Sequence, residues 1–124
     1  MTELREILFY SVLASDQSPI VVGQIVAAAR ARNMERGITG LLVFDGLRFC
    51  QHMEGPRDEV LRLMTQIAAD ARHAQIRVVY EGMLAQRRYL RFEMGLAEVE
   101  NGEDLANFSQ LAGAEALAHF LALR

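Results

Sequence analysis

The stretch of residues 37–55 constrains the fold more than any other part of this sequence. Two apolar runs in it flank Asp45-Gly46, a residue pair that is typical of a two-residue hairpin loop because both positions tolerate positive φ angles. We therefore predict a β-hairpin closed by a type I′ turn. Such a hairpin would place two antiparallel strands next to each other in a sheet.

Gln51 is the anomalous residue of this hairpin. Alternation along the second strand puts it on one face together with Phe49 and Met53. If that face is the core, the amide brings two donors and an acceptor into it, and an unpaired buried polar group costs about 1–3 kcal/mol. We therefore expect a partner for the Gln51 amide, and the nature of that partner bears directly on the function.

Composition and charge indicate the number of domains, the cellular compartment and the classes of partner that are not expected. A chain of 124 residues supports one domain with a single core. The formal net charge of −3 favours neither a nucleic acid nor an anionic membrane as a partner. The charged N-terminus and the lack of an apolar run of about 20 residues argue against a secretory signal and a membrane helix. Cys50 is the single cysteine, which fits a reducing compartment, so we expect a small cytoplasmic domain.

The rest of the chain alternates predicted strands and helices with short connections. We expect a β-strand over residues 4–13, a helix from Ser18-Pro19 to near Asn33, a second helix from Gly55-Pro56, and strands over 76–84 and 90–96. Helical spacing returns after residue 102. The order β-α-β-β-α-β-β predicts an α+β, ferredoxin-like sheet with the two main helices on one face.

The second face of this sheet also needs a cover. Alternation points Ile7, Phe9, Leu41 and Val43 to the face away from the two helices, and a broad apolar sheet face is not left in water. We therefore expect residues 1–98 to form the domain. Residues 99–124 should form a helical extension that packs on the sheet or in a dimer interface.

Three uncharged polar side chains are expected to meet under the two helices. Tyr10 shares a strand face with Leu8 and Val12, Gln51 lies on a neighbouring strand, and Asn33 ends the first helix. In a ferredoxin-like sheet the strands that carry Tyr10 and Gln51 lie side by side. A slot with one phenol and two amides offers donors and acceptors without charge. Such a slot suits a flat, neutral heterocycle better than a metal ion or a phosphate.

In these residues the sequence resembles the BLUF domains, a family of blue-light sensors that use flavin. The resemblance covers about residues 4–97. The blocks that carry it occur in the family's order and spacing: Phe9-Tyr10-Ser11, Asn33, Gly37-Ile38-Thr39-Gly40-Leu41-Leu42, Phe49-Cys50-Gln51-His52-Met53-Glu54-Gly55-Pro56, Asp70-Ala71-Arg72-His73, Arg87-Arg88-Tyr89 and Met94.

The resemblance implies a role for each matching residue. Tyr10 would be the photochemical donor of an electron and a proton, and Gln51 would be the amide that switches. Ile25 and Ile67 would sandwich the isoalloxazine ring, and Asn33 would hydrogen-bond it. The full set of implied cofactor contacts is Tyr10, Ile25, Arg32, Asn33, Gln51, Ile67, Asp70 and Met94. The implied cofactor is FAD, with FMN and riboflavin as alternatives.

The resemblance also implies a mechanism and an output. Light would drive transient transfer of an electron and a proton from the tyrosine, the glutamine would rotate or tautomerise, and the flavin would end chemically unchanged. Phe92 and Met94 would carry the signal, although Phe92 stands where many BLUF domains have a tryptophan and cannot donate a hydrogen bond. We expect no enzyme activity. The output would pass through protein–protein contacts, in a homodimer or higher homo-oligomer and to a downstream protein partner.

Each of these residues also has an ordinary structural interpretation. Taken alone, Tyr10 would be a core tyrosine, Asn33 a helix C-cap, and Gln51 a partner of a backbone carbonyl or a buried water. The three histidines lack the spacing of metal ligands, so we expect no metal site. Two other functions stay open. One is an interaction module that has kept the fold and lost photoactivity, and the other is a small enzyme of the acylphosphatase type, which the missing phosphate loop disfavours.

Overall fold

The elements follow the predicted order along the chain. The computed structural model describes residues 3–18, 20–96, 105, 108 and 110–123, with the backbone alone at 93–96 and 123. The elements are β1 (Leu4–Leu13), α1 (Val21–Arg36), β2 (Thr39–Phe44), β3 (Arg48–Pro56), α2 (Arg57–Ala68), β4 (His73–Leu84), β5 (Phe92–Leu96) and α4 (Gly113–Leu123).

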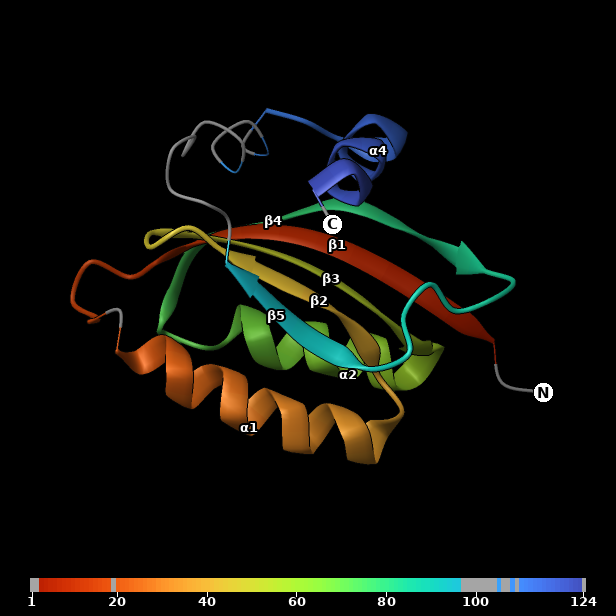
Figure 1. The fold of residues 1–124 in the computed structure, drawn as a ribbon, viewed down its shortest axis with the longest axis horizontal. Helices are drawn as coiled ribbons and strands as arrows, with labels where there is room; N and C mark the ends of the chain where they lie inside the picture. The colour runs from red at the N-terminus through yellow and green to blue at the C-terminus, as the bar shows by residue number, and fades with distance from the viewer. Residues whose placement is uncertain (1–2, 19, 97–104, 106–107, 109, 124) are drawn as a thin grey trace.

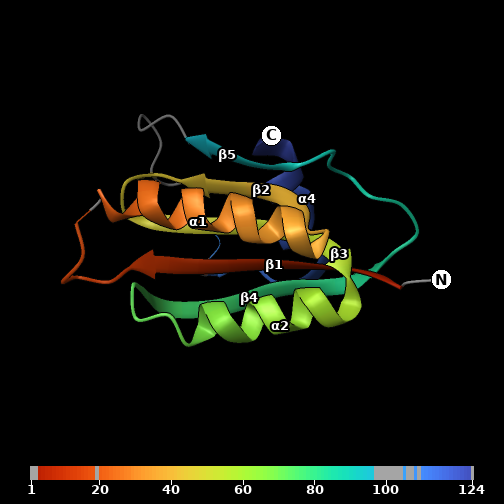
Figure 2. The same ribbon diagram turned by 90° about the horizontal axis from the view of Figure 1, so that it is seen from below.

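Helices cover both faces of a five-stranded sheet. The strand order is β4-β1-β3-β2-β5, in which β2 and β5 are parallel and the other neighbours are antiparallel. Helices α1 and α2 lie side by side on one face of the sheet, and α4 lies on the other (Figure 1; Figure 2). The predicted α+β, ferredoxin-like architecture is confirmed, with β1 and β3 adjacent near the centre of the sheet.

Strand β1 is buried on both faces. Ile7 and Phe9 pack in a cluster with residues of α2, whereas Leu8 and Tyr10 pack in a cluster with residues of α4. The prediction that Ile7 and Phe9 face away from α1 and α2 is therefore wrong. Both sets of alternate residues are apolar, so a spacing of two could not tell one face of this strand from the other.

Helix α1 starts later and ends later than predicted. It begins at Val21, after a turn in which the Val21 amide donates to the Ser18 carbonyl at 2.9 Å. It continues past Asn33 to Gly37, which ends it with a left-handed φ of 69° and an amide that donates to carbonyls of the last turn. Glycine adopts this conformation without a Cβ penalty. The C-cap is therefore Gly37 and not Asn33, while Pro19 lies outside the described residues.

The β2–β3 hairpin is confirmed, but its turn is not of type I′. The loop consists of Asp45, Gly46 and Leu47, and among these Gly46 alone has a positive φ, of 101°. The Asp45 carboxylate accepts hydrogen bonds from the amides of Leu47 at 3.0 Å and Arg48 at 2.7 Å. These side-chain bonds close the loop without the second positive φ that a type I′ turn requires.

Helix α4 covers the face of the sheet away from α1 and α2 (Figure 1). Its Ala116 and Phe120 are fully buried against sheet residues, and Leu41 and Val43 lie on this face as expected. The predicted domain boundary at residue 98 lies outside the described residues, so the division into residues 1–98 and 99–124 stays a prediction. In the part of the chain that the structure describes, no helix is long and apolar enough to cross a membrane.

Candidate functional site

A narrow slot is lined by residues of α1 and α2, the two helices that lie side by side on one face of the sheet (Figure 2). Both helices, the strands beneath them and the loop after α2 contribute to its lining, which consists of Ile25, Ala28, Ala29, Arg32, Leu42, Gln51, Gln66, Ile67, Asp70, Arg72 and His73. We name it the α1–α2 slot. Its volume is about 50 Å³, which is room for a few water molecules.

Gln51 forms part of the floor of the α1–α2 slot. Along β3, alternation places Phe49, Gln51 and Met53 beneath the helices, where Phe49 and Met53 are fully buried and Gln51 is 6% exposed. The amide predicted from the sequence therefore faces a cavity and not the packed core. It offers two donors and one acceptor group to whatever enters that cavity.

Five residues that the resemblance assigned to the cofactor line this slot. Ile25 comes from α1 and Ile67 from α2, so aliphatic groups stand on both sides. Arg32 and Asp70 add charge, and Gln51 adds a neutral amide. The slot thus joins apolar walls to polar and charged groups that can fix the orientation of an organic ligand.

Tyr10 does not lie in the slot. In the β1–β3 ladder Gln51 pairs with Phe9, and Tyr10 pairs with Cys50. Directly paired residues of antiparallel strands point to the same face of a sheet. Tyr10 therefore projects from the other face, where it packs in a cluster with Phe108. The prediction that Tyr10 and Gln51 meet in one slot is wrong, because the ring on the face of Gln51 is that of Phe9.

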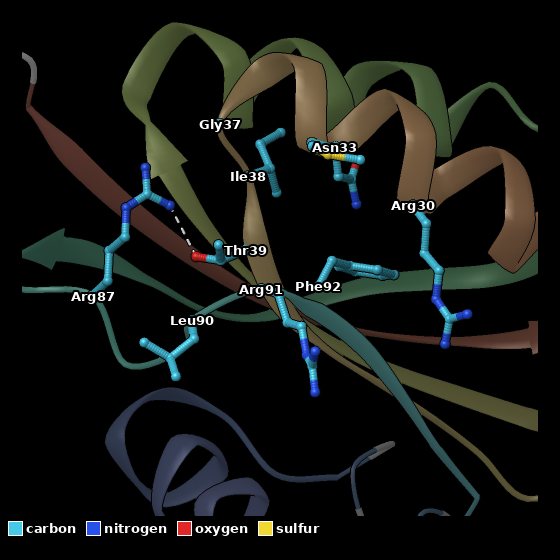
Figure 3. A pocket seen from close by; sticks show the side chains of 10 residues that line it. Arg30, Asn33, Gly37, Ile38, Thr39, Arg87, Leu90, Arg91 and Phe92 are labelled. Carbon is cyan, nitrogen blue, oxygen red and sulfur yellow. Dashed lines mark hydrogen bonds between the residues drawn. The ribbon is translucent and has the colours of Figure 1, made fainter.

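Asn33 is buried in a different cavity. It is 0% exposed, and neither polar atom of its amide has a hydrogen-bond partner among the described residues. The cavity is a pocket of about 1030 Å³ beside α1 and β5, lined by Arg30, Asn33, Met34, Gly37, Ile38, Thr39, Arg87, Leu90, Arg91 and Phe92 (Figure 3). The structure therefore places Asn33 and Gln51 in two separate cavities and not in one slot.

Phe92 and Met94, the residues assigned to signalling, belong to the edge strand β5. Phe92 is buried, packs in a cluster with Leu42 and Phe49, and lines the larger pocket. The backbone of Met94 pairs with Leu42. The side chain of Met94 lies outside the described residues, so its predicted contact with the cofactor stays a prediction.

The charge in the α1–α2 slot comes from two arginines and one aspartate. The Arg72 guanidinium binds Asp70 with an Nε–Oδ1 distance of 2.9 Å and an Nη2–Oδ2 distance of 2.6 Å. These hydrogen bonds hold the pKa of Asp70 at about 2, so the carboxylate is charged at neutral pH. Burial lowers the pKa of Arg32, and the nearby Arg36 and Arg72 act in the same direction. Two guanidinium groups against one carboxylate favour an anionic group at this end of the slot.

The sequence reasoning missed six lining residues, of which three are apolar (Ala28, Ala29 and Leu42) and three are polar (Gln66, Arg72 and His73). His73 Nδ1 lies 3.0 Å from the hydroxyl of Ser11 on β1, and burial lowers the pKa of His73. Arg72 and His73 belong to the block Asp70-Ala71-Arg72-His73, which is one of the blocks that carry the resemblance to the BLUF family. This block was the signal from which the two residues could have been predicted. Gln66 had no such signal. It accepts a hydrogen bond of 2.7 Å from Arg36 Nη1 and so joins α2 to α1.

A buried polar network lies on the opposite face of the sheet, under α4. His52 Nε2 lies 2.7 Å from Glu6 Oε1, and His52 Nδ1 lies 2.8 Å from the Tyr89 hydroxyl. The His52 ring meets the Phe120 ring of α4 edge-on, with 5.7 Å between the centroids. Burial lowers the pKa of His52, although the Glu6 carboxylate acts in the other direction. The network joins β1, β3, the β4–β5 connection and α4.

Comparison with known proteins assigns the chain to a family. A family model described as sensors of blue-light using FAD matches residues 4–95. The chain belongs to the BLUF family. The dark-state structure of BlrB, a BLUF protein, matches it with a TM-score of 0.82 and 28% sequence identity, over 99% of this chain and 96% of that chain. The BLUF fold is that of a sensor domain, and FAD is the cofactor of the family.

Two relatives of this BLUF chain are much longer proteins. The blue light- and temperature-regulated antirepressor BluF of Escherichia coli K12 is 33% identical over 73 residues, which are 59% of this chain and 18% of BluF. The photoactivated adenylate cyclase subunit beta of Euglena gracilis is 32% identical over 88 residues, which are 71% of this chain and 10% of that protein. The chain thus spans less than a fifth of the length of either relative.

Proposed function

We propose that this BLUF chain binds a flavin in the α1–α2 slot and reports the state of the flavin to other proteins through the α4 face of the sheet. The observation that carries the proposal is the position of Gln51, a neutral amide on the floor of a slot between Ile25 and Ile67. FAD is the cofactor of the family. FMN and riboflavin would present the same ring to these residues.

The chemistry of the slot fits a flavin ring. Aliphatic side chains on α1 and α2 can cover the two faces of a flat ring and remove them from water. The Gln51 amide can pair with the polar edge of the ring as a donor or as an acceptor. When bound, a flavin supplies the absorption of blue light and one-electron chemistry, while the residues of this chain bind it, orient it and shield it from solvent.

The slot has to widen before it can hold this ring. Its volume of about 50 Å³ is well below the roughly 300–1,000 Å³ of typical ligand pockets. Arg36 joins the two helices, because its Nη1 donates to Gln66 and its Nε lies 3.7 Å from Glu59 Oε2. Contacts between partly exposed side chains contribute about 0–1 kcal/mol. The contacts of Arg36 therefore add only a small cost when a ligand separates α1 from α2.

Arg32 is suited to the phosphate groups of FAD or FMN. It lines the slot, and its Nε is buried without a hydrogen-bond partner among the described residues. A guanidinium group binds phosphate oxygens through charge-assisted hydrogen bonds. Arg72 adds a second positive charge nearby, although its guanidinium group is already paired with the Asp70 carboxylate.

Gln51 is the residue through which the state of the flavin would reach the protein. Rotation or tautomerisation of its amide exchanges a donor for an acceptor at the ring edge, and one such hydrogen bond is worth about 0.5–1.5 kcal/mol. Inverting a two-state equilibrium takes about 5.5 kcal/mol, so a cooperative element must amplify the change. We assign this role to β5 and α4, with a second copy of the chain or a downstream protein as the receiver. Tyr10 has no part in this proposal, since it lies on the α4 face.

Reconstitution with flavin tests the proposal. The purified chain is incubated with FAD, FMN or riboflavin, freed of excess ligand, and examined by absorption and thermal melting. We expect a yellow protein with a raised melting temperature, because ligand binding adds about RT ln(1 + [L]/Kd) to the stability of the folded state. Ile25→Arg puts a charge into the wall of the slot and should abolish binding. Gln24→Arg, at an exposed position of the same helix, should bind normally, and a colourless wild-type chain that melts equally with and without flavin would contradict the proposal.

A further inference from the structure

Every tyrosine of the chain lies on the face of the sheet away from the α1–α2 slot. The sequence has three tyrosines and no tryptophan. Tyr10 and Tyr80 pack in the cluster under α4. The Tyr89 hydroxyl lies 2.8 Å from His52 Nδ1, and the His52 ring contacts Phe120 of α4. The face under α1 and α2 is therefore left without a phenol or an indole.

Phe9 occupies the position in which a phenol would lie beside Gln51. It pairs directly with Gln51 across β1 and β3. It is fully buried and packs in the same cluster as Met53 and Ile67, of which Ile67 also lines the slot. An aromatic ring thus stands next to the amide on the floor of the slot, but this ring carries no hydroxyl group.

A phenol at this position could do what the Phe9 ring cannot. A tyrosine in contact with an excited flavin can give one electron from its ring and one proton from its hydroxyl, both to the flavin, and both can return afterwards. Phenylalanine has no hydroxyl proton to give, and its ring is far harder to oxidise. Gln51 would then keep the same hydrogen-bonding neighbours before and after light, so nothing would drive its amide to turn.

The oxidisable groups on the α4 face do not replace the missing phenol. Tyr10 follows Phe9 directly, but its ring points to the other side of the sheet, so its hydroxyl cannot share a proton with Gln51. Cys50 lies in the same cluster as Tyr10, and burial raises the pKa of its thiol, which keeps it protonated.

We propose that Phe9 uncouples this BLUF domain from a tyrosine-driven light cycle. The chain binds flavin and absorbs blue light, but light alone leaves Gln51 in the arrangement that it has in the dark. The state of the flavin that Gln51 reports in the wild-type chain is then its binding or its reduction and not its excitation. Replacement of Phe9 by tyrosine is sufficient to restore the cycle. The inference rests on the proposed function, because it requires a flavin in the slot.

Blue illumination of three FAD-loaded proteins tests the inference. The wild-type chain, Phe9→Tyr and the matched control Tyr10→Phe are compared without added reductant, by absorption spectra before, during and after light and by the fluorescence lifetime of the bound flavin. We expect the wild-type chain and Tyr10→Phe to show an unshifted spectrum and a long lifetime. Phe9→Tyr should show a reversible shift to longer wavelength and a shortened lifetime, because the new phenol donates an electron to the excited ring.

A reversible red shift in the wild-type chain would overturn the inference, whether or not Tyr10→Phe abolishes it. A Phe9→Tyr protein that binds FAD and stays unresponsive would overturn the claim that this one side chain decides the response. If Phe9→Tyr fails to fold, the wild-type chain still tests the inference. An unshifted spectrum of the wild-type chain in the light supports it, and a shifted spectrum overturns it. A wild-type chain that takes up no flavin would instead overturn the proposed function, and the inference with it.

Discussion

Gln51 and His52 are consecutive residues of β3 whose side chains lie on opposite faces of the sheet. Gln51 lines the α1–α2 slot, while His52 contacts Glu6 and the Tyr89 hydroxyl under α4. A displacement of β3 caused by a ligand in the slot would therefore act directly on the network on which α4 rests. No long series of intermediate residues is needed to connect the two faces.

Gln51→Leu in the Phe9→Tyr background should remove the light response that Phe9→Tyr confers. Leucine has a similar volume but no donor or acceptor, so it cannot exchange one hydrogen bond for another at the flavin edge. The affinity for FAD should fall by only about two- to tenfold, which corresponds to one hydrogen bond of about 0.5–1.5 kcal/mol. Difference spectra and fluorescence titration measure the two effects. A normal red shift in the double variant would remove Gln51 from the switch.

Arg32→Ala should distinguish phosphorylated flavins from riboflavin. An exposed or half-buried charge pair contributes about 0.2–1 kcal/mol, so we expect FAD and FMN to bind up to about fivefold more weakly and riboflavin to bind as before. Fluorescence titration with the three ligands checks this. Arg62→Ala, at an exposed position of α2, is the matched control. Equal losses for all three flavins would place Arg32 against the ring and not against a phosphate.

The sequence was sufficient to predict that Gln51 lies under the two helices, but not which ring of β1 lies beside it. Gln51 between Phe49 and Met53 marks one face of β3, so its position under the helices followed from local alternation. In β1 every residue from Glu6 to Ser11 is buried, and each face carries one polar residue, Glu6 on one face and Ser11 on the other, so polarity does not distinguish the two faces. Whether Phe9 or Tyr10 lies beside Gln51 depends on the register between β1 and β3. A slip of one residue would exchange the two rings.

Asn33 and Asp45 illustrate two further limits of local reasoning. Asn33 is compatible with a helix end, but Gly37 adopts the left-handed conformation at lower cost and carries α1 one turn further. Asn33 thereby stays inside the helix, on its buried side. Asp45-Gly46 is compatible with more than one hairpin loop, and the hydrogen bonds of the Asp45 carboxylate to two backbone amides select the observed one.

Arg36→Met should accelerate the entry of flavin into the slot. The substitution keeps an apolar stem of similar length and removes the contacts to Gln66 and Glu59 that join α1 to α2. We expect a faster association rate in stopped-flow fluorescence and a loss of less than about 1 kcal/mol in the stability of the flavin-free chain. Arg30→Met, at an exposed position of the same helix, should leave the rate unchanged. If Arg36→Met also leaves it unchanged, the helices separate elsewhere.

The flavin-free chain should lose stability as the pH falls below about 6.5, the pKa of an unperturbed histidine. Burial lowers the pKa of both His52 and His73 in the folded state, so the unfolded chain takes up protons at a higher pH than the folded one. The free energy of unfolding contributed by these groups is therefore complete above about pH 6.5 and is lost as the pH falls toward their folded-state pKa values. Urea unfolding at about pH 7.5 and about pH 5.5 measures the difference.

His52→Gln should make this pH dependence smaller without removing the network under α4. Glutamine keeps one donor and one acceptor for Glu6 and Tyr89 but does not titrate, so the proton uptake of the unfolded chain at this position disappears. His73→Gln should act in the same way beside Ser11, and the two effects should add, because the residues lie on different faces of the sheet. Equal stability of the wild-type chain at both pH values would show that burial does not keep these imidazoles neutral.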